Sequence, residues 1–283
     1  FGLMPDNLMR YRGDVGVNMV IMALITLGGL GFTVLVELYR LSRQRLRPGG
    51  RLAPRRGLSW YSRTVLATSA FLVVAGAALL FLGELNTGSA GPDRTDAVLG
   101  AFFQSVTCRT AGFNTLDIGR MGEASLVIMI LLMFIGGSPG SCAGGIKTTT
   151  FRVLVAFGRG QMRGGRQAVI GRFAVDEATL NRAVTLTIFS LGIVLVALLL
   201  LCFTEGATMA HHLAPGRFMD ILFEVVSAFG TVGLTTGLTP HLTPTGMVVI
   251  IGHLFEGSLG PIVFLSVLQG FQARPRYQWP EQG

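Results

Sequence analysis

Five apolar stretches alternate with polar segments along the chain, and each is about long enough to cross a membrane. They cover residues 15–38, 64–82, 124–137 with a continuation beyond residue 147, 183–203, and 244–268. A hydrocarbon core of about 30 Å requires about 20 helical residues. The pattern therefore predicts an all-α membrane protein with several spans.

Two further segments are neither full membrane spans nor ordinary loops. Residues 96–121 read DAVLGAFFQSVTCRTAGFNTLDIGRM, and residues 217–242 read RFMDILFEVVSAFGTVGLTTGLTPHL. Each begins with about ten residues of helical character, and a helix of that length can only enter the membrane and return. We expect two re-entrant segments.

These two segments form an internal repeat. FQSVT (103–107) matches FEVVS (223–227) at an offset of 120, and TAGF (110–113) matches TVGL (231–234) at an offset of 121. The repeating unit is thus a span, a short helix, a Thr-x-Gly strand and a second span. It occurs twice whole, and residues 15–38 are interpreted as the closing span of an earlier copy.

A Thr-x-Gly strand suits the passage of a dehydrated cation. Backbone carbonyls and threonine hydroxyls can replace water around the ion, and glycine permits the backbone angles that this needs. A short helix that points its C-terminal end at the site favours a cation there. The alternative is a glycine turn with a threonine cap, which does not explain the matched approach to both strands.

Charge predicts the orientation of the spans. The chain has 23 basic and 15 acidic residues, and only 13% of its residues are charged. The arginines gather in two blocks, over residues 40–63 and 152–182, each of which follows an apolar stretch. The positive-inside rule assigns both blocks to the cytoplasm. No nucleic-acid-binding motif accompanies the arginines, so we expect no nucleic-acid partner.

The sequence GGSPGSCAGGIKTTT (136–150) contains Lys147, the one lysine in the chain. A phosphate-binding loop needs Gly-Lys-[Ser/Thr] after a strand, whereas here Ile146 separates Gly145 from Lys147 and an apolar span precedes the loop. Non-helical backbone at membrane depth must be buried or line water. The stretch is therefore interpreted as the unwound middle of a membrane helix.

The motifs FFQSVTCRTAGFNT (102–115), GGSPGSCAGGIKTTT (136–150), LFEVVSAFGTVGLTTGLTP (222–240) and GGLGF (28–32) resemble those of the Trk/Ktr/HKT superfamily of potassium transporters. The resemblance implies four linked potassium-channel-like units around one filter, with potassium uptake across the cytoplasmic membrane. It also implies a homodimer and a cytosolic nucleotide-binding regulatory subunit, with no catalytic residues and no cofactor other than the transported K⁺.

On this basis the chain divides into three parts. Residues 1–45 close a preceding repeat; residues 46–175 form the third repeat, with a filter at 109–113 and a broken helix at 124–158; residues 176–283 form the fourth, with a filter at 230–234, a last helix at 244–271 and a cytoplasmic tail. The chain would then supply two of four filter strands and correspond to the C-terminal portion of a longer protein.

The resemblance also assigns the candidate site residues. The filter candidates are Arg109, Thr110, Ala111, Gly112, Gly230, Thr231, Val232 and Gly233. The gate-loop candidates are Gly136, Gly137, Ser138, Pro139, Gly140, Ser141, Gly144, Gly145 and Lys147. In the last helix the usual family arginine is replaced by Ser258, next to Glu256 and Gly257, which suggests a weaker internal barrier or a compensating charge elsewhere.

Several alternatives stay open at this point. Lys147 either holds one state of the loop or snorkels to the cytoplasmic face. The transported ion could be sodium, because the first two filter strands are not in this sequence. Two alternatives belong to other classes of protein. One is a membrane enzyme with a metal held by His211, His212, His241 or His253. The other is a non-conducting fragment of a transporter.

Overall fold

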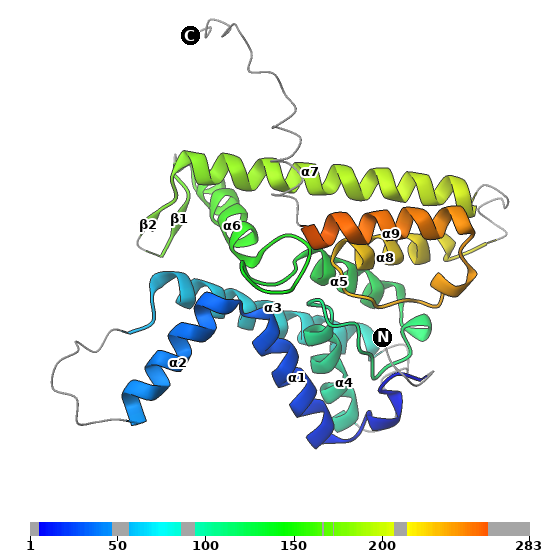
Figure 1. Ribbon diagram of the computed structural model, residues 1–283, viewed down its shortest axis with the longest axis horizontal. Helices are drawn as coiled ribbons and strands as arrows, with labels where there is room; N and C mark the ends of the chain where they lie inside the picture. Colours follow the sequence, from blue (N-terminus) through cyan, green and yellow to red (C-terminus); the bar gives the residue numbers. More distant parts are fainter. Residues whose placement is uncertain are drawn as a thin grey trace, which may run out of the picture.

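The structure, a computed structural model, describes residues 6–46, 57–85, 94–165, 167–171, 173–206 and 214–259 (Figure 1). Within these ranges the chain is mostly helical, as predicted. The helices are α1 (Val15–Gly29), α2 (Phe32–Leu46), α3 (Trp60–Glu84), α4 (Arg94–Thr107), α5 (Glu123–Phe134), α6 (Thr148–Met162), α7 (Glu177–Leu201), α8 (Arg217–Phe229) and α9 (Pro244–Leu259). One antiparallel hairpin pairs β1 (Val169–Ile170) with β2 (Phe173–Ala174).

Two helices are long and apolar enough to cross a membrane by themselves, α3 and the continuous helical stretch Glu177–Glu205 that begins with α7. The bent pair α1 and α2 passes the same test only when it is counted as one span, and α5 is a shorter apolar helix. The described part of α9 ends at Leu259, so the predicted continuation of the last helix to residue 271 lies outside the described residues.

The first predicted span does not run straight, and the prediction of one continuous helix over residues 15–38 is wrong. α1 and α2 meet at an angle of 111°. Gly31 has a left-handed φ of +83°, directly after Leu30, whose amide bonds to the carbonyl of Thr26. A left-handed glycine after the last helical residue is a common helix stop. Because the residues on both sides of this stop are apolar, the hydropathy pattern did not predict the bend.

Two units of similar build contain the remaining spans. In the first, α3 packs against α4 and α5; in the second, α7 packs against α8 and α9. Figure 1 shows α7, α8 and α9 gathered on one side, while α4 lies on the other side next to α1. The units meet where α5 packs against α8.

The core lies at this contact between α5 and α8. Met129 and Met133 of α5 and Phe223 and Phe229 of α8 are at most 1% exposed. Phe229 also stacks on Phe134 with ring centroids 5.7 Å apart. Burying large apolar side chains from both units fixes the end of α5 against the end of α8. Both helix ends lead directly into candidate site residues.

Candidate functional site

Both short helices end in Thr-x-Gly loops that share an unusual backbone. Thr110 and Thr231 have positive φ values of 74° and 51°, and Gly112 and Gly233 have values of 77° and 85°. A left-handed conformation is rare for a β-branched residue. Its recurrence at equivalent positions shows that the sequence repeat extends to the backbone path of these loops.

A hydroxyl near the end of each helix holds the chain as it leaves the loop. Thr107 Oγ1 donates to the carbonyl of Phe113 at 2.6 Å, and Ser227 Oγ donates to the carbonyl of Leu234 at 2.7 Å. Both bonds join equivalent positions of the repeat. They keep the Thr-x-Gly residues in a tight turn beside the helix end.

A carboxylate from each long helix ties it to the start of the returning helix. Glu84 accepts from the amide of Gly122 at 3.3 Å. Glu205 accepts from the amide and hydroxyl of Thr243 at 3.1 and 2.5 Å. Sequence reasoning missed this pair, although Glu84 and Glu205 are related by the same offset of 121 as the filter candidates.

The two units differ behind the loops. Glu224 of α8 accepts hydrogen bonds from the hydroxyls of Thr235 and Thr239, the latter at 2.8 Å. Its counterpart Gln104 is fully buried, and neither of its amide atoms has a partner among the described residues. Arg109 is likewise buried, with Nε and Nη2 unpaired within the described part of the chain. The first unit thus carries buried polar atoms without described partners, whereas the second unit pairs the carboxylate at the equivalent position.

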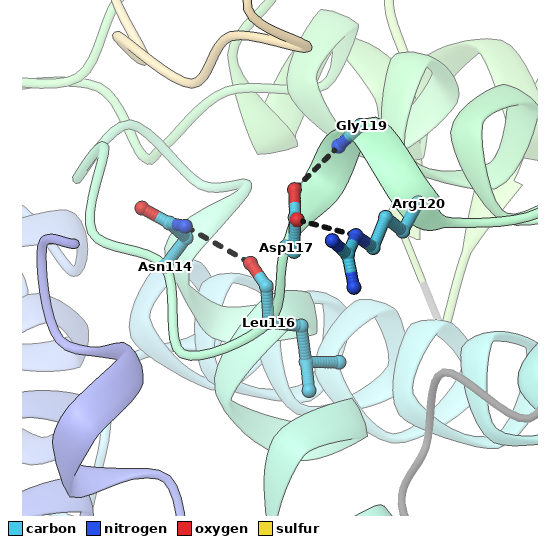
Figure 2. A network of polar contacts seen from close by, with 5 residues as sticks. All are labelled: Asn114, Leu116, Asp117, Gly119 and Arg120. Atoms are coloured by element: carbon cyan, nitrogen blue, oxygen red, sulfur yellow. Dashed lines mark hydrogen bonds and ion pairs between the residues drawn. The ribbon is translucent and has the colours of Figure 1, made fainter.

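Residues after the first Thr-x-Gly loop close the turn by local polar contacts, which Figure 2 shows. Asn114 Nδ2 donates to the carbonyl of Leu116 at 2.9 Å, and Asp117 accepts from the amide of Gly119 at 3.2 Å. Asp117 also pairs with Arg120 at 3.2 Å. On the other side, Asn7 Nδ2 donates to the carbonyl of Gly112 at 3.3 Å, so the N-terminal segment lies against this loop.

The gate-loop candidates form a compact non-helical segment between α5 and α6. Ile135 and Ile146 pair as an isolated parallel bridge, and the amide of Thr148 bonds to the carbonyl of Gly137 at 3.0 Å. A Cβ added at Gly136 would collide with the carbonyl oxygen of Gly144. The glycines therefore allow the two halves of the break to touch through their backbones.

Polar side chains bond the backbone groups that the break releases. Lys147 Nζ donates to the carbonyl of Ala143 at 2.5 Å, and Ser141 Oγ donates to the carbonyl of Ser138 at 2.6 Å. Thr148 and Ser138 are fully buried and join through their hydroxyls at 3.2 Å. In this structure the ammonium group of Lys147 thus forms a hydrogen bond within the loop.

The structure brings this loop onto the second Thr-x-Gly loop. The amide of Gly144 donates to Thr231 Oγ1 at 3.1 Å. A Cβ at Gly144 would lie 2.6 Å from that hydroxyl and 2.8 Å from the carbonyl oxygen of Gly230. Among the described residues, no hydrogen bond joins the loop to residues 109–112 in the same way.

The last-helix candidates face different surroundings. Glu256 Oε2 lies 3.2 Å from Nδ1 of His253, and both side chains line a pocket between α7 and α9. Ser258 is exposed. Gly257 between them packs against the carbonyl of Phe229, at the end of α8. Sequence reasoning did not pair His253 with Glu256, although a separation of three residues places them on one helix face.

The described residues contain no group of three or more His, Cys, Asp or Glu side chains that could hold a metal ion. Of the four histidines considered for such a site, His211 and His212 lie outside the described residues.

Comparison with known proteins accounts for nearly the whole chain. Ktr system potassium uptake protein B of Bacillus subtilis is 39% identical over 280 residues, which cover 98% of this chain and 58% of that protein. Potassium/sodium uptake protein NtpJ of Enterococcus hirae is 35% identical, over 100% of this chain and 60% of that protein. The chain therefore spans about three fifths of the length of these relatives.

The crystal structure of the potassium transporter TrkH from Vibrio parahaemolyticus matches with a TM-score of 0.68 at 19% identity, over 89% of this chain and 51% of that one, which supports the fold. The relatives named here are ion transporters rather than enzymes, in agreement with the expectation of no catalytic residues. The sequence model for TrkH, described as a cation transport protein, matches residues 1–268. The chain therefore belongs to the TrkH family of cation transport proteins.

Proposed function

We propose that this chain contributes two of the four strands of a potassium filter in an uptake protein of the cytoplasmic membrane, gated by the loop at 136–147. The observation that carries the proposal is the hydrogen bond from Gly144 to Thr231 at 3.1 Å, which attaches the break in one helix to a filter candidate. The relatives are named as potassium or potassium/sodium uptake proteins, which supports the choice of ion.

Both Thr-x-Gly loops supply the chemistry that a partly dehydrated cation needs. Carbonyl and hydroxyl oxygens replace water around the ion, and the C-terminal ends of α4 and α8 add a negative partial charge beside them. The recurring left-handed angles give the two loops the same backbone path, as symmetric strands around one axis require. The two remaining strands would come from outside this sequence.

The loop is suited to act as a gate because it contacts the filter candidate without side chains. Gly144 can approach Thr231 closely, and the bond from Lys147 to Ala143 holds the loop in this arrangement. We infer that this arrangement restricts passage and that permeation requires the loop to move. The alternative for Lys147, snorkelling to the membrane surface, predicts no effect on flux.

The last helix bears on the barrier below the filter. Ser258 carries no charge where the family has arginine, and Glu256 pairs with His253 in the pocket beside α7. We propose that the barrier in this protein is weaker as a result. Restoring the charge with Ser258→Arg is expected to lower flux, and unchanged flux would reject this part of the proposal.

Orientation and assembly are proposed from charge and resemblance. The arginine-rich ends of the spans are assigned to the cytoplasm, with the polar segments after α3 and α7 on the outer side. A homodimer and a cytosolic nucleotide-binding regulatory subunit, with no nucleic-acid partner, stay predictions from the resemblance and the charge pattern.

The test is cation flux through the protein in its natural full length, reconstituted in vesicles under a potassium gradient. Lys147→Met removes a hydrogen bond worth about 1 kcal/mol and is therefore expected to raise the flux about fivefold. Lys147→Arg retains a donor and should change the flux less. Absence of any alkali-cation flux would reject the function in favour of a non-conducting protein. Equal flux in all three proteins would favour snorkelling.

A second candidate is sodium transport, which is favoured by the similarity to the potassium/sodium uptake protein of Enterococcus hirae. The same vesicles distinguish the two ions. Flux that persists when sodium replaces potassium on both sides would favour the sodium-permeable reading.

A further inference from the structure

The helix α2 has one face fixed to the protein and one face open. Val34 packs with Leu30 and Val65 in a small apolar cluster against α3. Glu37 accepts from the amide and hydroxyl of Ser59, just before α3, at 3.2 and 2.9 Å. These contacts attach α2 to the N-terminal end of α3 along one side.

The open face of α2 combines aromatic and basic side chains. Phe32 is 70% exposed and Tyr39 is 64% exposed, and Arg40 and Arg43 are exposed beside them. Separations of seven, eight and eleven residues from Phe32 place all four on one helix face. Aromatic rings and arginines on one face are typical of helices that lie in a membrane interface.

The bend places this face where a membrane surface can meet it. At 111° to α1, α2 cannot continue through the bilayer in the direction of that helix. More arginines follow in sequence, at positions 45, 47 and 51. An anionic leaflet complements this charge, since arginine forms paired hydrogen bonds with phosphate.

The same bend holds the gate-loop candidates. The amide of Phe32, the first residue of α2, donates to the carbonyl of Gly140 at 3.1 Å. The amide of Ser138 donates to the carbonyl of Gly29 at 3.0 Å. A Cβ at Gly31 would lie 2.5 Å from the carbonyl oxygen of Pro139. Three consecutive loop residues therefore rest on the joint between α1 and α2.

We propose that α2 is an interfacial helix that binds anionic phospholipid at the cytoplasmic leaflet, and that its seating on the lipid sets the position of loop residues 138–140. The inference rests on the proposed role of that loop as a gate. Moving the start of α2 must move the loop or break the bonds to Gly140 and Ser138. The charge of the lipid is thereby coupled, through these backbone contacts, to the passage of the cation.

The loop provides its own reporter for the test. Cys142 is exposed, Cys108 is buried and Cys202 is half-buried, so a Cys202→Ser background leaves one reactive thiol in the described chain. The full-length protein is placed in phosphatidylcholine discs, with or without roughly one third phosphatidylglycerol, and the rate of Cys142 modification is measured. About a fivefold factor for each of Arg40 and Arg43 predicts a rate change of up to about 25-fold on adding the anionic lipid.

Paired variants identify the surface responsible. Arg40→Gln with Arg43→Gln should abolish the lipid dependence. The control, Arg159→Gln with Arg163→Gln, removes the same charge from exposed positions at the end of α6 and should retain it. Equal rates of Cys142 modification in both lipids would overturn the proposal. So would a loss of the lipid dependence in the control pair as large as in the Arg40 and Arg43 pair. A change in the rate of Cys142 modification that appears only when an acidic cytosolic protein is added, and not with anionic lipid, would also overturn the proposal.

Flux measured in the same lipids separates this inference from the proposed function. Potassium flux that is insensitive to lipid charge, with insensitive Cys142, rejects the inference alone. Absent flux with lipid-sensitive Cys142 rejects the proposed gate and leaves the attachment of α2 to the lipid.

Discussion

The amide of Gly144 and the hydroxyl of Thr231 lie 3.1 Å apart, although 87 residues separate them in sequence. This bond joins the break between α5 and α6 to the loop after α8. Because Gly144 has no side chain, the loop can approach the hydroxyl this closely. The loop and the Thr-x-Gly turn therefore cannot move apart without breaking this bond, and the first two predictions test it.

Thr231→Val removes the acceptor and keeps the shape of the side chain. An amide left without a partner costs about 1–3 kcal/mol, so the bonded loop state should become less populated by roughly tenfold. The rate of Cys142 modification, measured in the full-length protein, should change accordingly, and Thr231→Ser should restore it. Thr110→Val alters the equivalent residue of the other unit and should leave Cys142 unaffected; a similar change there would contradict the assignment.

Gly144→Ala tests the packing of the same contact. Its Cβ would lie 2.6 Å from Thr231 Oγ1, so the loop or the turn must shift, at a cost of about 1–3 kcal/mol in the free energy of unfolding. Gly158→Ala in α6 is the control, because no atom lies within 4 Å of the added Cβ. An alanine inside a helix should stabilise it by about 0.5–1 kcal/mol. Thermal unfolding in detergent should therefore shift in opposite directions, and shifts of the same sign would refute the packing argument.

Glu205 and Thr243 connect the end of one span to the start of the next. Thr243→Val leaves the buried carboxylate without its hydroxyl donor, at 2.5 Å in the structure, and should lower the free energy of unfolding by about 1.5–3 kcal/mol. Thr243→Ser keeps the donor and should be nearly neutral. A valine variant as stable as the serine variant, compared by thermal unfolding, would show that the carboxylate finds other partners.

Hydropathy and the internal repeat were sufficient to predict both short helices and the break after α5, because length and glycine content limit the alternatives. They could not predict the bend at Gly31, since apolar residues on both sides satisfy the same pattern. The contact from Gly144 to Thr231 was equally hidden, because it joins distant segments through a backbone amide. Glu84 and Glu205 were within reach, because the offset of 121 relates them too.

Asp176, which precedes α7 outside the membrane-spanning segment, provides a test of the fold that depends on pH. Its carboxylate accepts from the amide of Thr179 at 3.0 Å. Hydrogen bonds from the side chain and then the backbone of Thr179 lower the pKa of Asp176 below its ordinary value. A carboxyl group with a lowered pKa stabilises the fold above its unfolded pKa of about 3.9, and the stabilisation is lost as the pH falls through the lower folded value.

Asp176→Asn isolates this effect, because asparagine can still cap the helix but does not titrate. The difference in thermal midpoint between the natural protein and the variant should be largest near neutral pH and should shrink as the pH falls from about 5 to about 3. Other carboxyl groups titrate in both proteins and cancel in this difference. A difference that stays constant over that range would mean that the hydrogen bond to Thr179 does not depend on the charge of Asp176.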